Sequence, residues 1–343
     1  MERRRIIGLD ALRGLAAGAV LLHHHGQYYD VLFGGRTPLG INFGAGHFGV
    51  ELFFIISGFV ILMTIERKRT VRSFVASRVT RLMPVFLAAL VLASVLLILW
   101  PMPQPFTRPT LWQFIANLTM APMLFGQDVI DLPCWTLTYE LVFYAYMALL
   151  LRLGLLRSIE WTGLVLIAAG LLFRAVVDVE HHHRTSIVLL AYYSNFFLIG
   201  ICLYRFIARQ ARPITYIALI LAIAMSGLGG GERAFNAPGW LYLPLTLAFT
   251  ALVWLATRRP GRWFTWPPLI FLGQISYPLY LVHVVVGFET IRFGIAEGWG
   301  TLAGVIAAAA VSVALATLLH YMIELPGARW SRSKLAQLRA ALA

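Results

Sequence analysis

Charged residues are scarce in this chain. Only 13% of its 343 residues are Asp, Glu, Lys or Arg, whereas 59% are hydrophobic, a balance too apolar for an ordinary soluble domain. The two cysteines lie far apart among apolar residues, so neither a disulfide framework nor a metal site is indicated. No repeat, low-complexity tract or long polar linker divides the sequence. We therefore expect an all-α, polytopic membrane protein with a single domain over residues 1–343.

Long apolar runs are abundant instead. Stretches of about 17 to 25 residues, the length that crosses about 30 Å of hydrocarbon, predict about ten transmembrane helices. A shorter segment, 111–126, is interrupted by polar residues and Pro122, so we expect it to be re-entrant or to lie on the outer surface. The helical core is predicted over 8–323. The ten predicted spans are 8–26, 47–65, 83–100, 135–153, 160–177, 186–207, 214–228, 240–257, 269–288 and 301–323.

Lysine and arginine indicate the orientation of these helices. With the N-terminus inside, ten crossings place most of the 28 Lys and Arg residues in the inner segments. A crossing at 111–126 would invert every later loop and remove this asymmetry. The net charge of +13 would suggest nucleic acid in a soluble protein, but here it marks the cytoplasmic side, so no nucleic-acid partner is expected. Both termini are predicted to be cytoplasmic, with a tail over 324–343.

The first span carries ionisable side chains, which cost at least about 2.5 kcal/mol each at membrane depth and are therefore functional candidates. Arg13 and His24 are eleven residues apart, which is three helical turns plus roughly 20°, so both face the same way. His23 and His25 are expected to point elsewhere. Asp10 precedes Arg13 by three residues and can pair with it along the helix.

Three further spans bring ionisable groups to a similar depth. The expected helix directions place Glu51, Glu140 and His283 in the outer layer that His24 also reaches. Polar residues with only scattered structural roles would not be expected to agree in depth. We therefore predict that the two histidines and two carboxylates form one site.

The inner side has a different chemistry. Arg78 and Arg81 are three residues apart on one helix face, just before Pro84. Planar guanidinium groups suit phosphate binding, which makes the pair a candidate phosphate site. For either arginine alone, contact with anionic membrane lipid is an equal alternative.

Five stretches of the chain together resemble the acyltransferase-3 family of integral-membrane acyltransferases. They are LDALRG with a histidine eleven residues after its arginine, GVELFFIISGF, RVTRLMP, WTLTYELVFY and SYPLYLVH, in order from residue 8 to about 283. The resemblance implies transfer of an acyl group, commonly acetyl from acetyl-CoA, to a hydroxyl that is often on a cell-surface sugar. It also implies a bacterial cytoplasmic (inner) membrane location.

The resemblance assigns roles to particular residues. The activity-linked Arg and His of the first motif fall on Arg13 and His24, the arginine pair on Arg78 and Arg81, and the acid of the fourth motif on Glu140. In one respect the chain departs from the family: it has Glu51 where members commonly have Asp.

Together these observations predict a mechanism. Acetyl-CoA is expected from the cytoplasm, with its phosphates on the arginine pair and Arg13 lining a passage for its pantetheine arm. His24, oriented by Glu140, is expected to act as general base on the acceptor hydroxyl. Acceptor binding or oxyanion stabilisation is expected from Glu51, Tyr280 and His283.

Three alternatives stay open at this stage. The first is a catalytically silent scaffold of a polysaccharide-export complex, for which His24 would be dispensable. A covalent acyl-histidine relay would use the same residues as direct transfer. A transporter would use buried Asp, Arg, His and Glu as a proton relay, although no inverted repeat is visible in the sequence. The acceptor is expected to be a glycan or lipid-linked sugar at the outer face.

Overall fold

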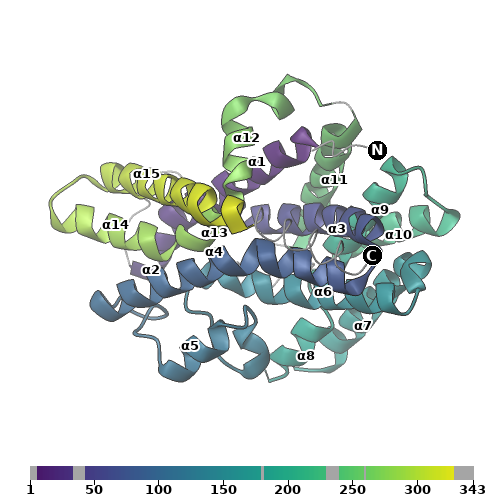
Figure 1. Cartoon of the computed structure of the whole chain (residues 1–343), viewed down its shortest axis with the longest axis horizontal. Helices are drawn as coiled ribbons and strands as arrows, with labels where there is room; N and C mark the ends of the chain where they lie inside the picture. Colours follow the sequence, from purple (N-terminus) through teal and green to yellow (C-terminus); the bar gives the residue numbers. More distant parts are fainter. Residues whose placement is uncertain (1–5, 34–42, 179–180, 229–238, 259, 328–343) are drawn as a thin grey trace, which may run out of the picture. The chain divides into compact units, whose positions relative to one another are not determined.

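The computed structural model describes residues 6–33, 43–178, 181–228, 239–258 and 260–327, and these ranges contain helices and no strand (Figure 1). The all-α prediction is thereby confirmed. Contacts group the chain into two compact units, whereas the single domain over 1–343 stays a prediction. The first unit comprises Met1–Ala16, Phe48–Phe74 and Thr136–Gly273; the second comprises Ala17–His47, Val75–Trp135 and Gln274–Ala343.

The first unit is built around α9 (Ser194–Ile207), which packs against α3 (Gly49–Lys68). Glycines allow this close approach, because a Cβ at Gly200 would lie 1.9 Å from the Ile55 carbonyl oxygen. The unit also contains the beginning of α1 (Ile7–His23), α6 (Trp135–Arg152), α7 (Ile159–Val176), α8 (His183–Val188), α10 (Pro213–Ser226), α11 (Tyr242–Arg258) and α12 (Pro267–Gln274).

A network of ion pairs joins four helices of this unit. Glu160 of α7 is fully buried and accepts hydrogen bonds from Arg212 at 3.0 Å and from Thr215 at 2.9 Å. Arg205 of α9 bonds Glu66 of α3 at 2.8 Å. Because each buried charge has a partner of opposite sign, the network stabilises one arrangement of these helices.

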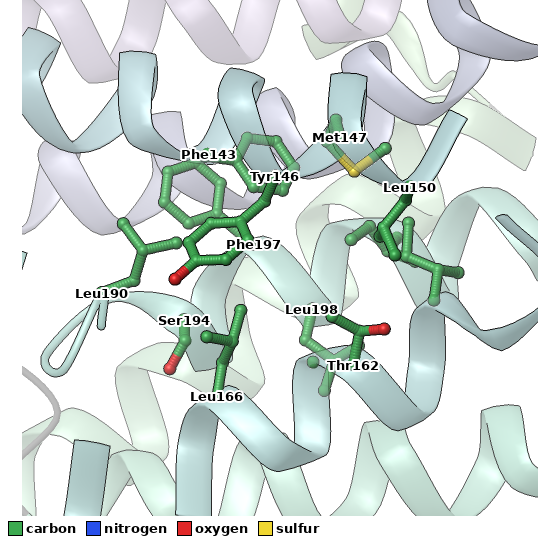
Figure 2. Close-up of a pocket in the computed structure, with 13 residues that line it drawn as sticks. Phe143, Tyr146, Met147, Leu150, Thr162, Leu166, Leu190, Ser194, Phe197 and Leu198 are labelled. Carbon is green, nitrogen blue, oxygen red and sulfur yellow. The ribbon is translucent and has the colours of Figure 1, made fainter. Parts of the chain in front are cut away.

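A cavity of about 30 Å³ lies between α6, α7 and α9 (Figure 2). Its walls are largely apolar, and the rings of Phe143 and Phe197 stack beside it with centroids 4.1 Å apart. Such a space holds about one water molecule. We therefore interpret it as a packing gap and not as a substrate site.

The second unit contains the end of α1, which continues into a π-helical turn, η1 (His24–Tyr28). Another π-helical turn, η9 (His320–Glu324), follows α15 (Thr301–Leu319). Helices α14 (Val285–Ala296) and α15 pack side by side (Figure 1). The remaining helices are α2 (Tyr29–Phe33), most of α4 (Val71–Leu99), α5 (Leu111–Asn117) and α13 (Ser276–Val282).

The count of about ten crossings is not confirmed. Five helices among the described residues are long and apolar enough to cross a membrane, and the bent pair α13 and α14 could add a sixth. Helices α9, α10 and α11 are apolar but shorter. The five are Gly44–Lys68, Val71–Leu99, Leu132–Arg152, Leu155–Val176 and Thr301–Gly327. These spans define a multi-pass membrane protein, and the orientation of its termini stays a prediction.

Two helices extend beyond the predicted spans: α4 begins at Val71, whereas its span was predicted from residue 83, and the last helix continues past residue 323. No full crossing was predicted over 111–126, and the structure agrees with this. Residues 111–126 contain only the seven-residue helix α5 and a short 3₁₀ turn, so α5 cannot cross a membrane by itself. The last span continues to Gly327, beyond the predicted start of the tail at 324, and residues 328–343 lie outside the described ranges.

The prediction of one continuous helix over 269–288 is wrong, since this stretch is divided among α12, α13 and α14. Pro278 explains the first break, because its ring nitrogen cannot bond the carbonyl of residue 274. At the second break the helix axis bends by 55°. There Nδ1 of His283 bonds the Tyr280 carbonyl, which a continuous helix would give to the Val284 N–H.

Candidate active site

Two of the predicted histidines meet in the second unit. His24 begins the π-helical turn η1, and His283 lies at the break between α13 and α14. Nδ1 of His24 and Nε2 of His283 are 3.1 Å apart, and both rings are buried. π-Helical turns inside α-helices are frequent at functional sites, because the wider turn redirects side chains. The sequence could place the two residues at one depth but could not predict their direct bond.

The surrounding carbonyl groups assign the protons of this pair. Nδ1 of His283 lies 3.0 Å from the Tyr280 carbonyl oxygen, which can only accept, so this nitrogen carries hydrogen and Nε2 is an acceptor in the neutral ring. Nδ1 of His24 lies 2.9 Å from the Val20 carbonyl oxygen and must therefore be the donor to both neighbours. Nε2 of neutral His24 is left with an unshared lone pair.

Nε2 of His24 is the free basic atom of this cluster. Within the described part of the chain no hydrogen bond engages it. Residue His24 retains 8% of its exposure, whereas His283 retains 1%. The His24 ring lies beside those of His23 and Tyr28, with centroids 5.3 Å and 5.4 Å away. This arrangement can accept a proton from a hydroxyl group.

His25 supports the pair from the backbone side. Its Nε2–H donates to the carbonyl oxygen of His283 at 2.6 Å. A Cβ at Gly287 would lie 2.1 Å from that Nε2 atom, so only glycine leaves room for the ring. Sequence reasoning expected His25 to point elsewhere and missed both residues. The only sequence signal for His25 is the run of three adjacent histidines, and this run does not indicate that His25 bonds the His283 carbonyl.

Tyr280 lies beside the pair, with its ring centroid 5.8 Å from that of His283. The residue is 9% exposed. Its carbonyl is one of the two acceptors that orient His283. The structure therefore brings His24, His283 and Tyr280 together.

Glu140 and Glu51 belong to the first unit. Oε1 of Glu140 accepts hydrogen bonds from Ser57 at 2.7 Å and from Tyr144 at 2.5 Å. Ser57 lies six residues, or about 9 Å, along α3 from Glu51. Glu51 is buried, and its Oε2 has no hydrogen-bond partner in the described ranges. The expected contact of Glu140 with His24 joins residues of different units and stays a prediction.

Arg13 lies in the first-unit part of α1, where this helix packs tightly on α12. A Cβ at Gly14 would lie 2.0 Å from the Leu269 carbonyl oxygen, and one at Gly273 would lie 1.8 Å from that of Asp10. Arg13 and Asp10 are both partly buried, and each interacts with a neighbouring group. This close packing fixes the position of the α1 segment that carries Arg13 against α12.

Arg78 and Arg81 lie on α4 as predicted by their spacing, and both are partly buried. Nε of Arg81 is 3.9 Å from Oε1 of Glu324, whose other oxygen lies 2.7 Å from Nδ1 of His320. The Arg81 side chain is 33% exposed, so it remains open to a ligand. His320 and Glu324 were missed because residue 324 was assigned to the tail and the π-helical turn was not foreseen.

Within the residues that the structure describes, no group of three His, Cys, Asp or Glu side chains could hold a metal ion. The histidine cluster is instead arranged by hydrogen bonds between rings and carbonyls.

A family model described as an acyltransferase domain matches residues 6–321. A multi-pass helical protein with this match is a membrane acyltransferase, which argues against the transporter alternative. The chain belongs to the acyltransferase-3 family.

Curated relatives cover nearly the whole chain. The exopolysaccharide production protein ExoZ of Rhizobium meliloti (strain 1021) is 28% identical over 89% of this chain and 96% of its own length. BcsY of Komagataeibacter xylinus, named as a membrane-bound transacylase, is 28% identical over 94% of this chain and 82% of its own. The acyltransferase MdmB of Streptomyces mycarofaciens is 26% identical over 94% and 91%. No solved structure matches the chain.

Proposed function

We propose that this acyltransferase moves an acetyl group from cytoplasmic acetyl-CoA to a hydroxyl of a cell-surface or lipid-linked glycan at the outer face of the bacterial inner membrane. The observation that carries the proposal is the free Nε2 lone pair of His24, which the bond to His283 leaves available. The name of the relative ExoZ refers to exopolysaccharide production and supports a glycan acceptor.

The transfer needs one base and one acid, and His24 serves as both. Nε2 takes the proton of the acceptor hydroxyl as its oxygen attacks the thioester carbonyl. The tetrahedral intermediate then collapses, the carbon–sulfur bond breaks, and the proton passes from His24 to the sulfur of CoA. While the ring is cationic, the Val20 carbonyl and Nε2 of His283 still accept its Nδ1–H and stabilise the charge.

The donor is held by arginines in this proposal. Arg78 and Arg81 bind the phosphates of CoA, and Arg13 lines the passage of its pantetheine arm. Partial exposure of Arg81 supports its role, because a fully paired side chain would have no donor left for phosphate.

The acceptor side is assigned to Tyr280 and Glu51. The hydroxyl of Tyr280 and the carboxyl of Glu51 can hydrogen-bond sugar hydroxyls. His283 takes a different part, because its Nε2 is already bonded to His24: it is a positioning residue for the base. Glu140 is proposed to stabilise the charged imidazole.

The test compares surface glycans of cells that carry the wild-type gene or His24→Ala. Mass spectrometry should show loss of one acetyl group per modified unit in the variant, with the protein still inserted in the membrane. His181→Ala is a matched control, because His181 is exposed and lies far along the chain. Near-normal acetylation in His24→Ala would overturn the proposed role of this residue.

The donor is tested separately with the purified protein. Acetyl-CoA and CoA should raise its thermal unfolding temperature, and Arg78→Gln with Arg81→Gln should remove the effect. Stabilisation that is unchanged in the double variant would contradict the proposed donor site without touching the role of His24.

A further inference from the structure

A second concave surface lies in the first unit and is lined by residues of α9, α10 and α11; Figure 1 labels these three helices. It is a groove of about 780 Å³ whose lining is mostly apolar. None of the predicted site residues lines it. The groove is therefore a surface that the proposed function does not use.

The groove has a floor and two walls. Phe206 of α9 forms the floor, and its ring contacts Tyr216 of α10 at 4.8 Å and Trp254 of α11 at 6.2 Å between centroids. On α11 the lining residues Leu247, Ala251, Trp254 and Arg258 share one face. The eleven steps from Leu247 to Arg258 rise roughly 16 Å, about half of the ~30 Å hydrocarbon thickness. The groove therefore has the length of one leaflet.

Two arginines lie at the same end of the groove. Arg209 follows the C-terminus of α9, and Arg258 is the last residue of α11. The guanidinium of Arg258 lies over the Trp254 ring at 4.7 Å. In the predicted topology both arginines belong to the cytoplasmic side.

These arginines differ from their neighbours in lacking an acidic partner. Arg205 and Arg212 are each paired with a carboxylate of the network around Glu160. In the described ranges neither Arg209 nor Arg258 has an ion pair. Two guanidinium groups without an ion pair among the described residues, at the end of an apolar groove, are complementary to an anionic head carried on a hydrocarbon chain.

We propose that the groove binds one anionic phospholipid, with an acyl chain along α11 and the phosphate between Arg209 and Arg258. Guanidinium groups bind phosphate in a bidentate manner, and an apolar groove with the length of one leaflet fits one fatty chain. A zwitterionic head carries its own ammonium group next to the phosphate and gains less from the two arginines.

The test uses the full-length protein purified in mild detergent and titrated with phosphatidylglycerol or phosphatidylcholine under native mass spectrometry. Wild-type protein should retain phosphatidylglycerol in preference. Arg209→Gln with Arg258→Gln should weaken phosphatidylglycerol binding by about tenfold and leave phosphatidylcholine unchanged. Arg152→Gln with Arg157→Gln is the matched control, because it removes two exposed arginines of the same unit outside the groove.

A second pair of variants tests the apolar channel without changing charge. Ala251→Trp fills the groove and should abolish phosphatidylglycerol retention, whereas Leu255→Trp, on another exposed part of α11, should not. Size-exclusion profiles identify any variant that fails to fold. If that happens in one pair of variants, lipid binding by the other pair tests the proposal. Equal binding of both lipids, equal losses in both arginine pairs, or unchanged binding in Ala251→Trp would each overturn the proposal.

Discussion

Nδ1 of His24 donates a hydrogen bond to Nε2 of His283 over 3.1 Å. The donor and acceptor are assigned by carbonyl groups on the far sides of both rings, at Val20 and Tyr280. Two backbone oxygens thus decide which nitrogen of His24 is basic. The catalytic proposal depends on this polarity, and it can be tested at His283 without altering His24.

Replacing His283 with Leu removes the acceptor of the His24 Nδ1–H. The tautomer of His24 is then held by Val20 alone, and we expect kcat to fall about a hundredfold, at the lower end of a general-base contribution, with an unchanged KM for acetyl-CoA. Steady-state acetyl transfer by the purified protein measures both constants. His283→Gln keeps an acceptor oxygen and should recover part of kcat. Equal losses in the Leu and Gln variants would contradict the positioning role.

The hydrogen bond from His25 to the His283 carbonyl gives a prediction at Gly287, which leaves room for the His25 ring. Gly287→Ala places a methyl group 2.1 Å from Nε2 of His25, so the ring must move away from the carbonyl. We expect a destabilisation of about 1–3 kcal/mol and a lower kcat. Thermal unfolding and acetyl-transfer assays measure the two effects.

Gly304→Ala is the control for that variant. Gly304 lies on α15, which packs on α14, but the nearest atom to its added Cβ would be 3.6 Å away, an ordinary contact. We expect near-normal stability and activity from it. If Gly287→Ala behaves like Gly304→Ala, the bond from His25 has no part in holding His283.

Much of this site could be predicted from the sequence, and the limit has a physical cause. Apolar length predicted the helical class correctly, whereas the shared face that spacing predicts for Arg13 and His24 stays a prediction. The bond between His24 and His283 depends on a π-helical turn and on a helix break, and both arise from tertiary packing. Hydropathy does not report π-helical turns or helix breaks, which is also why 269–288 was predicted as one helix.

A variant of Arg81 tests whether this residue binds the 3′-phosphate of the donor or its diphosphate. Arg81→Gln should raise KM for acetyl-CoA about tenfold with little change in kcat, because a charge-assisted bond to the donor is lost. If Arg81 binds the 3′-phosphate, the variant should no longer distinguish acetyl-CoA from acetyl-dephospho-CoA. Arg72→Gln, an exposed position on the same helix, should keep the discrimination. An unchanged KM in Arg81→Gln would remove this residue from the donor site.

Asp131 precedes the span that begins at Leu132 and gives a pH prediction. Burial raises the pKa of its carboxyl to about 8, and the backbone N–H groups of Leu132 and Val285 offset part of this shift. The folded protein therefore holds a proton that the unfolded chain has released above about pH 4. Stability should fall as pH rises from about 4 to 8. Asp131→Asn cannot ionise, so its unfolding temperature should depend less on pH over this interval, and parallel pH profiles for variant and wild type would refute the prediction.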